Sequence, residues 1–332
     1  RESKEAYSHF ELESLPSGGW GYMHFPLTAR YARNLGVDCV SHTGKFHTSW
    51  GDFHSFKNKA ALEFECFRML ALNCKCEIGD QLHPNGAIDE HVYRLIGSVY
   101  KQVKAKEPWC RGAKAISEIG VFTTEEFTNE RVPGATAGAV QMLQEAAHQF
   151  EILDSRSDFS QYKLVILPDG ITLKPHLASK LDEYVKRGGK LIATGRSGLN
   201  TDGDAFALNS LGVTLKTRQV LAEDGLPAGG RDTGQGLQYV DYIMPGDELG
   251  KGLPPTEHAM YMKAVDIQAK PGGTILAQVV DSYFHRTWEH FCSHRQTPSS
   301  GKISQPAVVQ MGNTIYFAHP IFTLYNKNAP NW

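Results

Sequence analysis

The chain has 332 residues, which exceeds one typical domain and predicts two, each large enough to bury its own core. Its formal net charge of -2 gives no basic surplus that would attract nucleic acid or anionic lipid. No apolar run reaches the roughly 20 residues that span a bilayer, and the first residues, RESKEAYSHF, lack the apolar core of a signal peptide. We therefore expect a cytoplasmic protein that takes a small neutral ligand and has no nucleic-acid or membrane partner.

The first third of the chain alternates strand signals with helix signals. Strands are predicted over 8–16, 37–44 and 74–84. Helices are predicted over 26–35, from Lys59 to about Leu72 behind an Asn58 cap, and from Asp89 onward. The 59–72 helix is apolar on most of its circumference, which predicts burial. Repeated βα units of this kind require a parallel sheet, either an open doubly wound sheet or part of a (β/α)₈ barrel.

A second α/β domain is predicted after the EPWC segment, of flavodoxin-like or amidotransferase-like type. Its strands are predicted over 114–123, 162–170 and 190–199, and its helices over 134–150 and 174–189. From about Leu215 the short apolar runs between glycines and prolines predict sheet to the end of the chain. An amidotransferase would need a cysteine after a strand, where this chain has Asp169, Gly170, Arg196 and Ser197. We therefore expect no amidotransferase activity.

The irregular stretch SHTGKFHTSWGDFHSFKN, residues 41–58, concentrates titratable and aromatic side chains. Three interpretations compete: a metal site, a sugar pocket or an ordinary polar loop. The spacings of His42, His47 and His54 match no recognised ligand motif, so we expect no metal. A sugar pocket needs a flat apolar surface and hydrogen-bond donors, which Trp50 and its polar neighbours supply.

Two further clusters have less specific patterns. The six cysteines include no CxxC pair and are expected to be mostly buried thiols. The stretch YFHRTWEHFCSHRQTP, residues 283–298, could form a metal or anion site, but its place in the second domain favours a buried polar network or a subunit interface.

Several motifs together resemble the C-terminal part of glycosidases related to glycoside hydrolase family 42, and more closely the family 151 type of α-L-fucosidase. These motifs are SHFELESLPSGGWGY, HTGKFHTSWGDF with KNKAALEFECFRMLAL, CEIGDQLHP, VYKQVKAKEPWC and LDEYVKRGGKLIATGRSGL. The resemblance implies that residues 1–110 are the last units of a catalytic (β/α)₈ barrel and that 111–332 are a β-galactosidase trimerisation-like domain. It also implies a cofactor-free, homo-oligomeric enzyme, a trimer or dimer, whose remaining barrel strands lie outside this chain.

The same resemblance implies retaining hydrolysis of a fucoside or, alternatively, a galactoside. A non-catalytic carbohydrate-binding or oligomerisation fragment remains a third interpretation. Related enzymes usually carry the nucleophilic Glu after the seventh strand, where CVSHTGKF has none. Because the reaction needs two carboxyl groups facing one pocket, the catalytic candidates are Glu11, Glu13, Asp52 and Asp80. The candidates for substrate binding are His42, Lys45, His47, Trp50, Trp20, Gln81 and His83.

Overall fold

The computed structural model describes residues 2–217, 240–284, 290, 292–294 and 296–328. The chain divides into two compact units, which meet between Ser117 and Glu118 in the sequence. Among the described residues, no helix is both long enough and apolar enough to cross a membrane.

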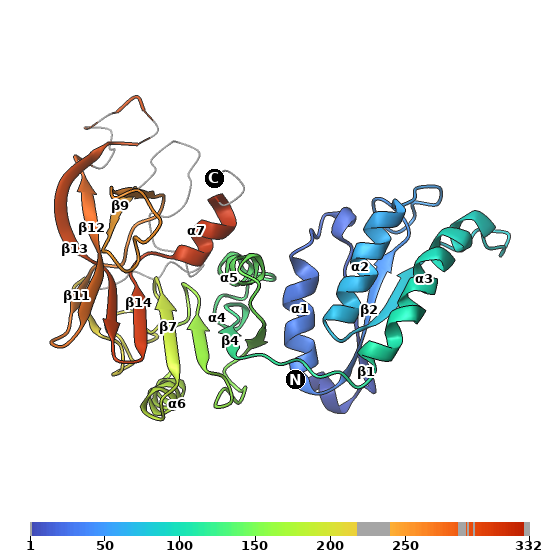
Figure 1. The fold of residues 1–332 in the computed structure, drawn as a ribbon, viewed down its shortest axis with the longest axis horizontal. Helices are drawn as coiled ribbons and strands as arrows, with labels where there is room; N and C mark the ends of the chain where they lie inside the picture. Colours follow the sequence, from blue (N-terminus) through green and yellow to red (C-terminus); the bar gives the residue numbers. More distant parts are fainter. Residues whose placement is uncertain (1, 218–239, 285–289, 291, 295, 329–332) are drawn as a thin grey trace. The chain divides into compact units, whose positions relative to one another are not determined.

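The first unit is a three-stranded parallel sheet with helices (Figure 1), in the order β1-β2-β3. Its strands are β1 (His9–Glu13), β2 (Asp38–Gly44) and β3 (Lys75–Gly79). Its helices are α1 (His24–Ala32), α2 (Lys59–Ala71) and α3 (Glu90–Cys110), with 3-10 turns at Glu2–Glu5, Pro16–Gly18 and Arg33–Leu35. The three predicted βα units are therefore confirmed.

Side-chain caps fix where α2 and α3 begin. Asn58 accepts a 2.8 Å hydrogen bond from the backbone N–H of Ala61, and Asp89 accepts one of the same length from that of His91. Both starts agree with the sequence prediction. The predicted burial of most of α2 is wrong, because the helix buries only one stripe and Phe64 is 51% exposed.

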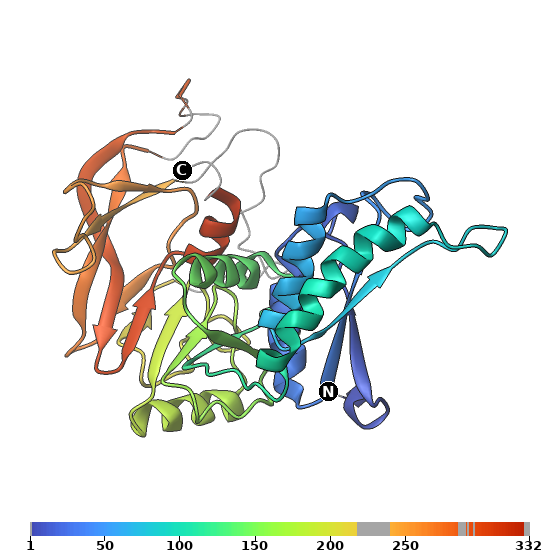
Figure 2. The same cartoon turned by 45° about the vertical axis from the view of Figure 1, so that its right-hand side comes forward.

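The two faces of this sheet differ. Alternate residues of the strands, among them Leu12, Cys39 and Ile78, pack against the helices, and Figure 2 shows the helices on one side of the sheet. The intervening residues form the opposite face, which none of the described helices α1, α2 and α3 covers (Figure 2). Parallel sheets are usually covered on both faces. The uncovered face carries the polar side chains described below.

The second unit is built on a nine-stranded mixed sheet, ordered β10-β9-β12-β13-β14-β7-β6-β4-β5, and a two-stranded ribbon of β11 and β8. Its strands are β4 (Ile119–Phe122), β5 (Phe150–Leu153), β6 (Leu164–Leu167), β7 (Lys190–Thr194), β8 (Val213–Leu215), β9 (Asp241–Pro245), β10 (His258–Met260), β11 (Ile267–Ala269), β12 (Thr274–Ser282), β13 (Ser299–Met311) and β14 (Thr314–Phe317). Its helices are α4 (Glu125–Thr128), α5 (Gly134–Glu145), α6 (Pro175–Lys186) and α7 (Ile321–Asn328).

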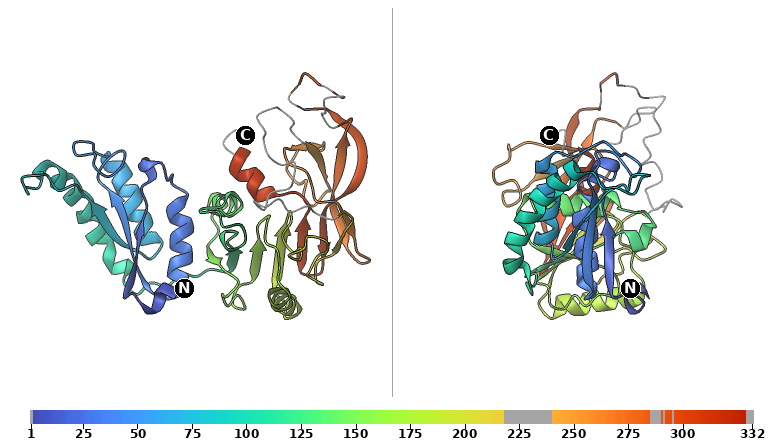
Figure 3. Two further views of the ribbon diagram at one scale, coloured as in Figure 1. Left: turned by 180° about the vertical axis from the view of Figure 1, so that it is seen from behind. Right: turned by 90° about the vertical axis from the view of Figure 1, so that its right-hand side faces the viewer.

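The parallel half of this sheet follows the predicted flavodoxin-like arrangement. Five strands, β5-β4-β6-β7-β14, pair in parallel, which is the 2-1-3-4-5 order of flavodoxin-like sheets. The antiparallel half contains the long curved ribbon of β12 and β13 (Figure 3), whose register shifts at several places. Such bulges bend a strand and increase its twist.

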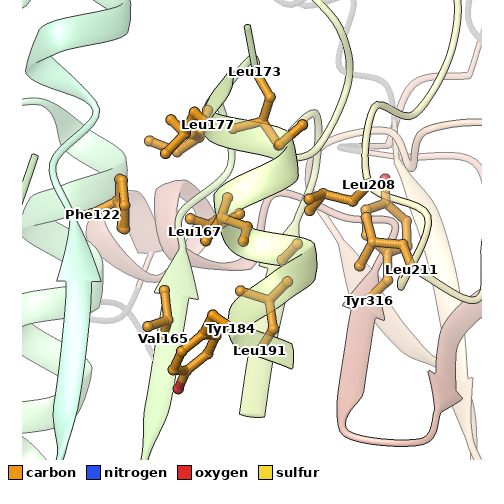
Figure 4. Close-up of a cluster of buried hydrophobic side chains, with 14 of the residues drawn as sticks. Phe122, Val165, Leu167, Leu173, Leu177, Tyr184, Leu191, Leu208, Leu211 and Tyr316 are labelled. Atoms are coloured by element: carbon orange, nitrogen blue, oxygen red, sulfur yellow. The ribbon is translucent and has the colours of Figure 1, made fainter. Parts of the chain in front are cut away.

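The main core of the second unit lies between α6 and the parallel strands (Figure 4). Leu177 and Tyr184 of α6 pack with Val165, Leu167 and Leu191 of β6 and β7. Gly188, at φ +99°, ends the helix as predicted, and the N–H of Gly189 donates to the carbonyl of Tyr184. The predicted helix over 174–189 therefore agrees with α6, whose buried residues Leu177, Leu181 and Tyr184 recur at helical spacing.

Two sequence predictions in the second unit are wrong. Phe150 was placed on a helix by its spacing, but it begins strand β5, because Ala147 turns to φ +58° and ends α5. Sheet was expected to reach the end of the chain, but β14 ends at Phe317 and α7 follows. The first turn of this helix closes where the carbonyl of Pro320 accepts a hydrogen bond from the N–H of Leu324, and residues 329–332 lie outside the described residues.

Candidate functional site

The uncovered face of the first sheet gathers carboxylates and a histidine from all three strands. Glu13 of β1 lies level with His42 of β2, which lies level with Glu77 of β3. Glu11, two residues before Glu13, shares the same face because side chains alternate along a strand. Glu11 and Glu13 therefore lie on one face of β1, together with His42 of β2.

Glu11, His42 and Glu77 form a close trio. The Nδ1 atom of His42 lies 2.7 Å from Oε1 of Glu11, and one ligand atom from each residue lies within 4.8 Å of the others. In the part of the chain that the structure describes, these two carboxylates and this histidine lie close enough together to hold a divalent metal ion. The Nδ1 atom of this histidine already shares a hydrogen bond with Glu11, whereas its Nε2 atom is buried without a hydrogen-bond partner among the described residues.

Trp50 joins the loop after β2 to the end of β1. Its indole Nε1 donates a 2.6 Å hydrogen bond to Oε1 of Glu13. Its ring meets the rings of His42 and Phe46 edge-on, with centroids 5.3 and 4.7 Å apart. Trp50 remains 41% exposed, so part of the indole is accessible beside the Glu13 carboxylate.

Gly79 provides the space in which Trp50 and His42 meet. A β-carbon built at Gly79 would lie 2.3 Å from Nε2 of His42 and 2.3 Å from Cη2 of Trp50. Contacts this short do not occur between real atoms, so a side chain at this position would displace both rings. The site therefore requires glycine at position 79, at the end of β3.

Lys45 organises the loop after β2 from within. Its side chain is only 1% exposed, and Nζ donates to the backbone carbonyls of Asp52, Phe53 and Ser55. The same ammonium lies 3.7 Å from Oδ1 of Asp80 at the end of β3. Protein partners thus surround the amine, which ties the loop to β3.

The remaining candidates lie around this loop. The hydroxyl of Thr48 donates a 2.6 Å hydrogen bond to Asp52, and this bond lowers the pKa of the Asp52 carboxyl. Asp80 accepts from the backbone N–H of Gln81 at 2.7 Å. His83 lies 5.4 Å from His54, centroid to centroid.

Two candidates lie at the edge of this arrangement. His47 is exposed, and its backbone N–H donates to Ser55 Oγ. Trp20 contacts His24 edge-on, with ring centroids 4.7 Å apart, in the connection between β1 and α1.

Sequence reasoning missed Glu77 on the uncovered face and a buried ion pair on the helix-covered face. Lys57 Nζ lies 2.8 Å from Oε2 of Glu65, and both side chains are at least 95% buried. Thr43 donates to the same oxygen at 2.6 Å. Glu77 alternates with Cys76 and Ile78, which face the helices, so the period-two pattern of KCEIG was the signal that could have revealed it.

In the second unit, the position where an amidotransferase would carry its nucleophile has a structural role. Asp169 follows β6 at φ +37°, and burial raises the pKa of its carboxyl. Thr194 Oγ1 and the backbone N–H of Thr323 both donate to this carboxyl at 2.5 Å. Asp169 therefore holds the first turn of α7. Within the cluster predicted at 283–298, residues 285–289, 291 and 295 lie outside the described residues.

The chain is similar in sequence to one family model and to several β-galactosidases. Residues 141–217 match the model of the β-galactosidase trimerisation domain. The β-galactosidase LacZ of Lactobacillus acidophilus is 26% identical over 172 residues, which cover 48% of this chain and 24% of that protein. The β-galactosidase LacA of Lactobacillus acidophilus is 23% identical over 227 residues, 60% of this chain and 32% of that protein.

Solved structures extend the match along the chain. The α-L-fucosidase isoenzyme 2 from Paenibacillus thiaminolyticus superposes with a TM-score of 0.87 and 38% identity, over 99% of this chain and 48% of that one. The β-galactosidase from Bacillus circulans sp. alkalophilus superposes with a TM-score of 0.70 over 98% of this chain and 49% of that one. Its 14% identity makes this second match evidence of the shared fold. The chain spans about half the length of these two solved proteins.

The fold and these matches define an α/β protein related to glycoside hydrolases. The predicted resemblance to family 42 glycosidases and to an α-L-fucosidase is confirmed.

Proposed function

We propose that this chain is part of a glycoside hydrolase that acts on α-L-fucosides, with the carboxyl ends of β1, β2 and β3 forming one wall of the sugar pocket. The observation that carries the proposal is the hydrogen bond from the exposed Trp50 to Glu13 at the end of β1, together with Asp80, which follows β3 and lies beside Lys45 of the same loop. The 38% identity to an α-L-fucosidase over nearly the whole chain favours this sugar.

The uncovered sheet face supports a barrel. In a (β/α)₈ barrel the helices cover the outside of the strands, and the inner face meets side chains from other strands. The polar face with Glu11, His42 and Glu77 is then the inner face, and the remaining strands come from outside these 332 residues. Catalytic groups in such barrels lie at the carboxyl ends of the strands, where Glu13 and Asp80 are found.

The proposed chemistry is the retaining two-carboxylate reaction. One carboxylate attacks the anomeric carbon while an acid donates its proton to the departing glycosidic oxygen. Water then attacks the glycosyl-enzyme and gives its proton to the deprotonated acid, which frees the sugar and restores the nucleophile. Asp80 is our first candidate for the nucleophile, because the Lys45 ammonium at 3.7 Å attracts its anion. Glu11, Glu13 and Asp52 are the other carboxylate candidates.

The other predicted residues take distinct roles in the proposal. The exposed part of the Trp50 indole offers its flat surface to the C–H face of the sugar, and His42, Gln81 and His83 donate to its hydroxyls. His47 and Trp20 contact more distant parts of the substrate. Lys45 acts as a positioning residue, because its buried amine is engaged by the loop carbonyls and Asp80.

The test uses the native polypeptide that carries these residues, assayed with 4-nitrophenyl α-L-fucoside and β-D-galactoside. We expect the fucoside to be the better substrate and Asp80→Asn to lower kcat by at least 100-fold. The control is Glu90→Gln, an exposed carboxylate on α3, which should leave both rates unchanged. If Asp80→Asn lowers kcat by less than threefold, Asp80 is not a catalytic residue. If the galactoside is the better substrate, the assignment of fucoside as substrate is wrong.

A second candidate function is favoured by the match to the trimerisation domain at residues 141–217. In this alternative the second unit assembles homo-oligomers of an enzyme, and this chain by itself serves in assembly or carbohydrate binding. Light scattering of the native polypeptide at several concentrations gives the mass of the assembly. A monomer at every concentration would rule the assembly role out.

A further inference from the structure

The two tryptophans that are candidates for substrate contact lie on two different loops of the first unit. Trp20 lies in the connection from β1 to α1, and Trp50 lies in the loop after β2. The loop after β2 is closed at its base, where the backbone N–H of Lys57 donates a 2.8 Å hydrogen bond to the carbonyl of Lys45. Loops whose ends lie close together pack by their own side chains and are frequently functional. The contacts that hold each loop at its base therefore fix where its indole lies.

A buried carboxylate contacts both of these loops. Glu65 of α2 is only 5% exposed. Its Oε2 accepts hydrogen bonds from Nζ of Lys57, at 2.8 Å, and from the hydroxyl of Thr43 in β2, at 2.6 Å. Its Oε1 accepts a 3.3 Å hydrogen bond from the hydroxyl of Tyr22. Glu65 thus joins α2 to the end of β2, to the base of the loop after β2 and to the connection from β1 to α1.

Helix α2 holds Tyr22 at a second point. Arg68, three residues after Glu65, donates a 2.9 Å hydrogen bond to the backbone carbonyl of Tyr22. The ring of Tyr22 also meets that of Phe64 edge-on, with centroids 5.4 Å apart. Residues three apart are neighbours on the surface of a helix, so Glu65 and Arg68 together hold the hydroxyl and the backbone of one tyrosine. The position of the β1–α1 connection at Tyr22 is therefore set by α2.

Stability by itself is a weak reason for the ion pair at the centre of this network. Lys57 and Glu65 are both at least 95% buried. Because taking two charges out of water is costly, a buried ion pair often stabilises no more than apolar side chains of similar volume. The pair differs from apolar side chains in its directed bonds, since Nζ of Lys57 donates to Thr43 and to Glu65, each at 2.8 Å. A fully bonded polar network of this kind rigidifies the segments that it joins.

We propose that Glu65 is a positioning residue of the sugar pocket, which holds the loop of Trp50 through Lys57 and the connection of Trp20 through Tyr22. The inference rests on the proposed function, because it assigns both indoles to that pocket. Glu65 itself bonds Thr43 on the helix-covered face of the sheet, so it acts through the two loops and not on the substrate. Its loss should weaken substrate binding more than it slows the reaction.

The experiment removes the ion pair without leaving a buried charge. The double variant Lys57→Met with Glu65→Leu replaces both side chains by apolar ones of similar volume, so the chain should still fold, which urea unfolding checks. The readout is the ¹⁹F NMR spectrum of the native polypeptide labelled with 5-fluorotryptophan, in which each signal is assigned by replacing its tryptophan with phenylalanine. We expect the signals of Trp20 and Trp50 to shift or broaden together, and the signal of Trp109 on α3 to stay in place.

Two further variants divide this effect. Tyr22→Phe removes one hydroxyl and should move the signal of Trp20 while it leaves that of Trp50 in place. The matched control is Lys59→Met with Glu63→Leu, which replaces a more exposed pair of the same residue types on the same helix and should move neither signal.

Steady-state kinetics relates the loop positions to substrate binding. For the double variant at positions 57 and 65, we expect KM for 4-nitrophenyl α-L-fucoside to rise about fivefold or more, with kcat lowered by less than about twofold. A chain that hydrolyses no glycoside contradicts the proposed function, whereas indole signals that do not move contradict the present inference. The two failures therefore appear in separate measurements.

Three results would overturn the inference. One is a folded double variant in which the signals of Trp20 and Trp50 stay in place. Another is equal movement of the Trp109 signal, which would show a general loosening of the unit. The third is a moved pair of signals with unchanged KM in an active enzyme. If the double variant does not fold, Tyr22→Phe decides the outcome, because an unmoved Trp20 signal in that variant also contradicts the inference.

Discussion

The 2.6 Å hydrogen bond from the indole of Trp50 to the carboxylate of Glu13 ties the loop after β2 to the last residue of β1. It fixes the direction of the one exposed indole on the polar strand face and occupies one oxygen of a candidate catalytic carboxylate. The two residues are 37 positions apart, so only the parallel pairing of β1 and β2 brings them together.

Replacing Trp50 tests whether this indole positions the sugar. Trp50→Phe keeps a ring but removes the donor to Glu13, so we expect KM for the fucoside to rise about fivefold with a smaller change in kcat. Trp50→Ala removes the ring as well and should raise KM further. Steady-state kinetics of the native polypeptide measures both, and Trp109→Phe, at a tryptophan that is 79% exposed on α3, serves as the control. Unchanged KM in Trp50→Ala would show that the indole does not contact substrate.

Gly79→Ala should destabilise the first unit and disorder the site together. Its β-carbon would approach His42 and Trp50 to 2.3 Å, and relieving such overlap costs about 1 to 3 kcal/mol of unfolding free energy. Urea unfolding followed by Trp fluorescence measures the loss. Gly97→Ala is the matched control, since nothing lies within 4 Å of its β-carbon inside α3, and it should stabilise by about 0.5 to 1 kcal/mol. Equal midpoints for both variants would contradict the steric argument.

Removing one partner of the buried ion pair should be more costly than removing an exposed charge. Glu65→Gln leaves Lys57 buried without its counter-charge, which typically costs about 3 to 5 kcal/mol. The matched change, Glu183→Gln, breaks an exposed pair with Arg187 in α6 and should cost less than about 0.5 kcal/mol. Equilibrium unfolding in urea distinguishes the two. A loss below 1 kcal/mol in Glu65→Gln would mean that the pair adds little to stability.

The second unit should lose stability in acid through Asp241. Burial by itself would raise the pKa of this carboxyl, but His319 at 3.4 Å and the N–H of Ala264 at 2.7 Å outweigh it and keep the pKa below its ordinary value. A carboxyl whose pKa is lower in the folded state than in the unfolded chain, where it is near 3.8, stabilises the folded state at pH values above 3.8. That contribution is lost as the pH falls through the pKa of the folded state.

The measurement is the free energy of unfolding in urea from pH 2.5 to 7, for the unaltered chain and for the Asp241→Asn variant. We expect the free-energy difference between them to be constant above about pH 5 and to shrink as the pH falls below the ordinary Asp value near 3.8. A difference that grows toward pH 2.5 would reverse the sign and contradict the lowered pKa.

Local signals in the sequence determined much of the first unit and the parallel half of the second. The Asn58 and Asp89 caps, the apolar stripe of α6 and its terminal Gly188 all act within a few residues, so they can be read along the chain. Phe150 shows the limit of such reading. Its spacing continues the helical pattern of α5, but the backbone at Ala147 adopts a positive φ, which no periodicity reveals.

The candidate site needed the tertiary structure, because its contacts join residues distant in sequence. Residue types and strand ends identified Glu11, Glu13, His42, Trp50 and Asp80 as candidates. The register of three parallel strands decided that Glu77 joins them and that Lys45 turns inward to the loop carbonyls. A shift of one residue in a strand would have turned its side chains in this set, such as Glu13, His42 or Glu77, to the helix-covered face. Sequence thus determined which chemical groups are present, and strand pairing decided which of them meet.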